Sequence, residues 1–115
     1  MFPFKIIFYT TQNNKQPVRE FISAQKPVML AEILREIDLL SEYGNALKMP
    51  HSKPLEDGIF ELRIKASSGI SRVLYFFYVD KQIILTNAFI KKTQKTPREE
   101  IEKAKKYKKD FLNKK

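Results

Sequence analysis

The chain has 115 residues, enough for one domain over residues 1–115 and too short for two, and its lack of cysteine excludes a disulfide scaffold and a thiolate metal site. The N-terminus has no basic region followed by an apolar run, and no window approaches about 18 uninterrupted apolar residues, so we expect a cytoplasmic protein that does not span a membrane. The net charge of +9 lies entirely in residues 59–115, which indicates a polyanionic partner, with nucleic acid ranked before an acidic protein or an anionic membrane.

The first part of the chain predicts a strand followed by two helices. Residues Phe4–Thr10 are an apolar run that ends in a polar loop, as a short strand does. Pro17 and Pro27 each stand where proline is favoured, in the first turn of a helix. The second helix is expected to be the longer, because its apolar residues recur at steps of three and four and Gly44 supplies a stop signal.

The segment Asn45–Gly58 is predicted to be irregular, since it contains two prolines and a turn-like Asp57-Gly58. It also carries His51, the only histidine of the chain. Histidine can exchange a proton near neutral pH, but a catalytic role needs a partner that the sequence does not identify. A loop histidine without a catalytic role is therefore the simpler interpretation.

Three strand-like runs follow and predict an antiparallel meander. They are Ile59–Ala66, Ile70–Val79 and Gln82–Ile90, and short turn-forming segments separate them. The middle run is almost continuously apolar, which is typical of a central strand. Together with the N-terminal strand, these runs predict an α+β domain with a four-stranded sheet, helices on one face and a basic site on the other.

Two-residue turns at Ser68-Gly69 and Asp80-Lys81 would set the register of this meander. They place Lys65 opposite Arg72, Arg63 opposite Leu74, Arg72 opposite Phe89 and Ile70 opposite Lys91. One end of one sheet face would then collect four cations, namely Arg63, Lys65, Arg72 and Lys91. A slip of one residue would move Arg63 to the other face.

A basic helix is predicted at the C-terminus. The spacing of Thr96, Pro97 and Glu99 is that of a capping box, with Thr96 as N-cap and Pro97 in the first helical position. Lysines cover most of the helix behind it, at Lys103, Lys105, Lys106, Lys108 and Lys109. These lysines form either a solvated face or a direct contact with phosphate.

The residue types that remain for chemistry are arginine, lysine, tyrosine and carboxylic acids. The chain has only three glycines, which removes most nucleotide-binding loops, and its one histidine without cysteine supports no metal site, so we expect no cofactor. Arginine and lysine can neutralise the charge that develops on a phosphorane-like transition state while a base removes a proton from the attacking hydroxyl.

Three segments of the second half resemble a known family. They are GIFELR at Gly58–Arg63, SRVLYFF at Ser71–Phe77 and NAFIKKTQKTP at Asn87–Pro97, and together they are similar to the HigB-like, phage-derived branch of the RelE/ParE toxin superfamily. The order of predicted elements agrees with that RelE-like fold over nearly the whole chain. The resemblance implies the toxin of a type II toxin–antitoxin pair.

The activity implied by the resemblance is that of an mRNA interferase. The RelE branch cuts mRNA in the ribosomal A site without metal, because the ribose 2′-hydroxyl attacks the adjacent phosphate and leaves a 2′,3′-cyclic phosphate. The implied partners are mRNA on the ribosome and a cognate antitoxin, expected to be of the helix-turn-helix type. The alternatives are a gyrase-directed, ParE-type binder and a nucleic-acid-binding or regulatory module that has lost toxicity.

Carried over residue by residue, the resemblance assigns the site to basic residues of the sheet. The arginine of the RVLY-type strand is Arg72, that of the ELR motif is Arg63, and the basic cluster after the last strand contains Lys91. Tyr75 and Glu61 are the candidate bases, since Asn87-Ala88 stands where the family often has histidine or glycine. Tyr75 is alternatively a core aromatic, and the arginines are alternatively partners of structural ion pairs. The expected RNA or ribosome contacts are Lys65, Lys92, Lys95, Lys105, Lys106 and Lys109.

Overall fold

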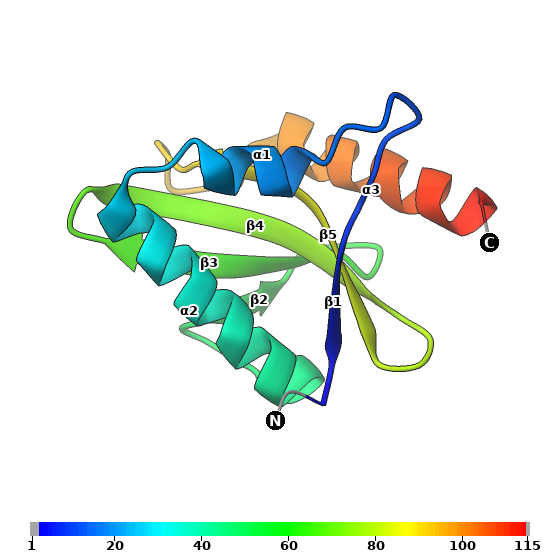
Figure 1. Ribbon diagram of the computed structural model, residues 1–115, viewed down its shortest axis with the longest axis horizontal. Helices are drawn as coiled ribbons and strands as arrows, with labels where there is room; N and C mark the ends of the chain where they lie inside the picture. The colour runs from blue at the N-terminus through cyan, green and yellow to red at the C-terminus, as the bar shows by residue number, and fades with distance from the viewer. Residues whose placement is uncertain (1–2, 115) are drawn as a thin grey trace.

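A computed structural model describes residues 3–114 of the chain (Figure 1). In chain order the elements are β1 (Lys5–Phe8), α1 (Pro17–Ser23), α2 (Pro27–Tyr43), the 3-10 turn η1 (Gly44–Ala46), β2 (Ser52–Pro54), β3 (Phe60–Ala66), β4 (Gly69–Tyr78), β5 (Gln82–Ile90) and α3 (Arg98–Asn113). The strands form one sheet in the order β1-β5-β4-β3-β2, in which β1 and β5 are parallel and the other neighbours antiparallel. The α+β class is therefore confirmed.

The sheet has five strands, so the prediction of four was wrong. The additional strand is β2, which lies within the segment expected to be irregular and pairs with the first three residues of β3. Three residues are too few to show an alternating pattern, and they end in Pro54. Proline is tolerated there because β2 is an edge strand, where a missing amide leaves no ladder bond unmade.

Helices cover both faces of the sheet (Figure 1). On one face, apolar residues of α1 and α2 pack with Leu62, Val73, Tyr75 and Leu85 of the sheet. On the other face, Ala104 and Phe111 of α3 pack with a second set of buried residues that includes Ile59, Leu74, Phe76 and Ile84. We expected all the helices on one face, but α3 instead covers part of the face on which the basic site was predicted.

The register of β3 against β4 differs from the expected one by two residues. Ala66 pairs with Gly69, so the turn is Ser67-Ser68, and Gly69 adopts a φ of +150° that other residues rarely adopt. Arg63 therefore lies opposite Arg72, and the predictions that pair Lys65 with Arg72 and Arg63 with Leu74 were wrong. A shift of two residues keeps each side chain on its face, so Arg63 and Arg72 still share one.

A β-bulge at Thr86 decides which residues of β5 face the basic site. Tyr75 pairs with Leu85 and Leu74 with Asn87, so Thr86 is an extra residue, and its hydroxyl donates to the carbonyl of Leu74 at 3.0 Å. The bulge reverses the alternation beyond it. Arg72 lies opposite Phe89 as predicted, and the amide of Lys91 donates to the carbonyl of Ile70 at 2.8 Å.

The start of α3 also differs from prediction. Pro97 is the N-cap and the helix begins at Arg98, without any side-chain capping bond. The capping box was therefore wrong, because the hydroxyl of Thr96 donates instead to the carboxylate of Glu61 on β3. This contact joins the segment before α3 to the sheet face that carries Arg72.

An ion-pair network ties α3 to the turn before β3, and it predicts an acid-sensitive contribution to stability. Arg98 donates to both carboxylate oxygens of Glu56, at 2.6 and 2.5 Å, and Lys105 also pairs with Glu56. The bonds from Arg98 and then from Lys105 lower the pKa of Glu56 from 4.5 to about 2. A carboxyl group with a lowered pKa stabilises the fold when the pH is above the ordinary pKa of that group. This stabilisation is lost as the pH falls through the lowered pKa.

The expected result is that Glu56→Gln lowers the thermal unfolding temperature at pH 7, and that the difference from wild type closes between pH 4.5 and about 2. Calorimetry or circular dichroism melts across this range measure it. A difference that stays constant down to pH 2 would show that the carboxylate charge of Glu56 does not contribute.

Candidate functional site

The site is built around a buried ion pair on the face that the sheet shares with α3. Arg72 is 4% exposed and Glu61 is 1% exposed, and Nε of Arg72 lies 3.6 Å from Oε1 of Glu61. Nη1 of Arg72 donates to the carbonyl of Ser71 at 3.0 Å. Among buried side-chain nitrogen and oxygen atoms of residues 3–114, Nε of Arg72 alone lacks a hydrogen-bond partner. The guanidinium is therefore held in place with unused donor capacity.

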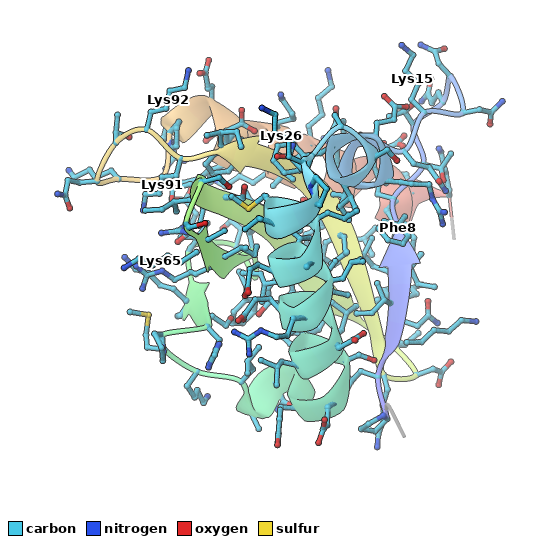
Figure 2. The ribbon with its side chains drawn as sticks, turned by 60° about the vertical axis from the view of Figure 1, so that its left-hand side comes forward. Phe8, Lys15, Lys26, Lys65, Lys91 and Lys92 are labelled. Atoms are coloured by element: carbon cyan, nitrogen blue, oxygen red, sulfur yellow. The ribbon has the colours of Figure 1, made fainter. Side chains whose placement is uncertain are left out.

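Further cations surround this pair. Arg63 lies opposite Arg72 in the register, and Lys53 of β2 lies opposite Glu61. A hollow of about 440 Å³ opens beside them and is lined by Arg63, Ile70, Arg72, Lys91, Lys92, Thr93 and Gln94. Figure 2 shows Lys65, Lys91 and Lys92 near the same end of the sheet, far from Lys15 and Phe8. We call Lys53, Arg63, Arg72 and Lys91, with Glu61 among them, the cationic cluster.

The cationic cluster disfavours its own positive charge. Burial lowers the pKa of Lys91, and the charge of Arg72 lowers it further, with smaller effects of the same sign from Arg63 and Lys53. Burial likewise lowers the pKa of Arg72, although Glu61 acts in the opposite direction. An anion in the hollow would relieve this repulsion, and planar guanidinium groups suit a phosphate in particular. The arrangement can thus bind a phosphate group and stabilise added negative charge on it.

The repulsion predicts that Arg63→Gln stabilises the free protein while it weakens anion binding. Like charges directly opposite each other on neighbouring strands are destabilising, so the gain is expected to be roughly 0.2–1 kcal/mol. Urea unfolding measures the gain, and titration with a short single-stranded RNA measures the loss of binding. Lys106→Gln, at an exposed position on α3, is the matched control. A less stable Arg63→Gln protein would mean that Arg63 is held by favourable contacts instead.

Two residues near the cluster were not recognised from the sequence. Lys53 joins it through β2, a strand too short to show a pattern. Glu36 is a buried residue of α2, and its Oε1 lies 2.9 Å from Nδ1 of His51. The signal for Glu36 was its position next to Ile33 and Ile37 on the buried side of the helix, where an unpaired carboxylate would be costly.

Tyr75 does not join the cluster. Strand alternation places it on the face covered by α1 and α2, where it is 1% exposed and its hydroxyl lies 2.5 Å from that of Ser52. Burial raises its pKa to about 12. The structure therefore corresponds to the alternative interpretation of Tyr75 as a core aromatic, and its hydroxyl does not face the hollow at Arg72.

The remaining predicted contacts are divided between two regions. Lys65 lies on the β3–β4 hairpin, and Lys92 and Lys95 follow β5, near the hollow or in the adjoining loop. Lys106 and Lys109 are exposed on α3. Lys105 is less free, since its ammonium group pairs with Glu56, Asp57 and Glu102. The structure therefore groups the hairpin and loop lysines with the arginines, and places the α3 lysines on a separate surface.

Within residues 3–114 no group of three histidine, aspartate or glutamate side chains is placed to hold a metal ion. No helix in the same range is both long and apolar enough to cross a membrane.

The fold and the site define an α+β domain with a buried arginine–glutamate pair in a cationic cluster that can bind phosphate. The model of the family described as "Phage derived protein Gp49-like (DUF891)" matches residues 20–109, and the chain belongs to this family. It is a RelE-like family of toxins from type II toxin–antitoxin systems. A search of curated proteins found no match.

Proposed function

We propose that the chain is a HigB-like toxin that cleaves mRNA on the ribosome in the cytoplasm and so inhibits translation. The observation that carries the proposal is the cationic cluster, in which Arg72 is buried and paired with Glu61 through an Nε that makes no hydrogen bond. Membership of the family supports the role of a toxin. The excess of positive charge in residues 59–115 supports a nucleic acid as the substrate.

In the proposed reaction the scissile phosphate lies over the two arginines. Arg63 and Arg72 bind its non-bridging oxygens and neutralise the charge that grows as the 2′-oxygen attacks. A base removes the proton of the 2′-hydroxyl as the bond between the 2′-oxygen and phosphorus forms, while the bond to the 5′-oxygen breaks. Lys91 lies beside this position, and its ammonium group can donate a proton to the leaving 5′-oxygen. The products are a 2′,3′-cyclic phosphate and a 5′-hydroxyl.

The proposed antitoxin, of the helix-turn-helix type, neutralises the toxin at the same place. Arg63, Arg72 and Lys91 are the buried or half-buried cations of the cluster and are complementary to carboxylates, so the antitoxin would present acidic side chains to these three residues. Apolar contacts around this centre would supply most of the burial.

The test is incubation of the purified chain with ribosomes programmed with a defined mRNA, followed by analysis of the RNA ends. Cleavage that requires the ribosome and leaves cyclic phosphates is the expected result. Intact mRNA, together with a DNA-damage response in cells that express the chain, would instead favour a gyrase-directed toxin. Binding to RNA without cleavage or growth arrest would favour a regulatory module.

A further inference from the structure

A hydrogen-bonded pair of His51 and Glu36 lies beside the cationic cluster. Nδ1 of His51 is 2.9 Å from Oε1 of Glu36. The side chain of Glu36 is 7% exposed, whereas that of His51 is 38% exposed. A buried carboxylate that accepts a bond from Nδ1–H selects the tautomer in which Nε2 is unprotonated. The pair therefore has the form of a base with an orienting group behind it.

The backbone fixes His51 in line with the two arginines. The amide of Arg63 donates to the carbonyl of His51 at 2.8 Å, Arg63 pairs with Arg72, and Arg72 pairs with Phe89. These residues form one row across the strands. His51 stands at the β2 end of the row, and Lys91 follows the β5 end.

A second hollow connects His51 to the arginines. It has a volume of about 420 Å³, and both members of the His51–Glu36 pair line it together with Arg63 and Arg72. The hollow that contains Lys91 shares Arg63 and Arg72 as lining residues. The two hollows therefore meet at Arg63 and Arg72, and His51 borders one of them while Lys91 borders the other.

We infer that His51, oriented by Glu36, is the general base of the RNA cleavage, an inference that rests on the proposed function. Nε2 of His51 takes the proton of the 2′-hydroxyl as the 2′-oxygen bonds to phosphorus. The bond to the 5′-oxygen breaks, and Lys91 supplies that oxygen with a proton. Base and acid on opposite sides of the phosphate suit an in-line displacement.

The charged groups that face this pair come from three elements. They are Arg35 of α2, whose Nη2 lies 3.8 Å from Oε2 of Glu36, Arg63 and Lys65 of β3, and Arg72 of β4. These cations draw the RNA backbone toward the imidazole.

Single-turnover cleavage on programmed ribosomes tests this role. His51→Ala is expected to cleave about 10²–10⁴-fold more slowly, the usual contribution of a general base. Free imidazole is expected to restore part of the rate, which a merely structural role would not allow. Glu36→Gln is expected to lose less, and Glu32→Gln, on the same helix and also bonded to Arg35, is the control that keeps the wild-type rate.

A second measurement needs no ribosome. The chain has one histidine, so nitrogen NMR spectra report the tautomer of His51 without assignment. The Nδ1-protonated form is expected in wild type and a mixture in Glu36→Gln. If the wild-type chain cleaves mRNA and His51→Ala cleaves it at the same rate, the role of His51 is overturned while the proposed function stands. A folded wild-type protein that produces no cyclic phosphate would overturn the proposed function as well.

Discussion

Replacement of Arg72 by alanine is expected to slow mRNA cleavage about 10²–10³-fold, the usual loss when one preorganised donor to a transition state is removed. The guanidinium is almost fully buried, bonded to the carbonyl of Ser71 and fixed beside Glu61, so it needs no reorganisation to meet the phosphate. Arg72→Lys is expected to recover only part of the rate, because an ammonium group cannot bridge two phosphate oxygens as a planar fork does.

The measurement is single-turnover cleavage at saturating toxin, with circular dichroism to show that each variant folds. Lys106→Ala, which removes an exposed charge on α3, is the matched control. It is expected to weaken ribosome binding slightly, with an effect that shrinks as salt rises, and to leave the cleavage step unchanged. If Arg72→Ala cleaves at the wild-type rate while Lys106→Ala does not, the site lies on α3 and not on the sheet.

Replacement of Glu61 by glutamine is expected to destabilise the protein by about 3–5 kcal/mol, because it leaves a buried guanidinium without its counter-charge. Glu61 is 1% exposed and also accepts the hydroxyl of Thr96, a bond that the amide oxygen of glutamine can still accept, so the substitution tests the charge. The free energy is measured by urea unfolding at neutral pH. Replacement of Glu99, which lies in the first turn of α3, by glutamine serves as the comparison.

A double variant distinguishes the ion pair from simple packing. Replacement of a buried pair by apolar residues of similar size is often neutral or stabilising, so Glu61→Leu with Arg72→Met is expected to regain most of the lost stability. The same protein is expected to remain inactive in cleavage. Equal instability of the double variant and Glu61→Gln would mean that the unpaired charge of Arg72 is not the source of the lost stability.

Local patterns in the sequence determined every helix and strand except β2, and they placed both arginines on one face of the sheet. Pro17 and Pro27 begin the two helices and Gly44 ends the second, as expected from backbone preferences that involve only neighbouring residues. Alternation along β3 placed Arg63 on the same face as Arg72 even though the turn was misassigned, because an error of two residues does not change faces.

Only the tertiary structure decided which other residues join the two arginines in the candidate site. The bulge at Thr86 sets the face of the residues that lead to Lys91, and the pairing of β2 with β3 brings in Lys53 and His51. Glu36 contacts His51 from α2, but in the sequence Glu36 is visible only as a carboxylate between apolar residues. Short-range periodicity fixes which way a side chain points within its own element, whereas register, an added edge strand and a contact between remote elements depend on packing energies that no local pattern contains.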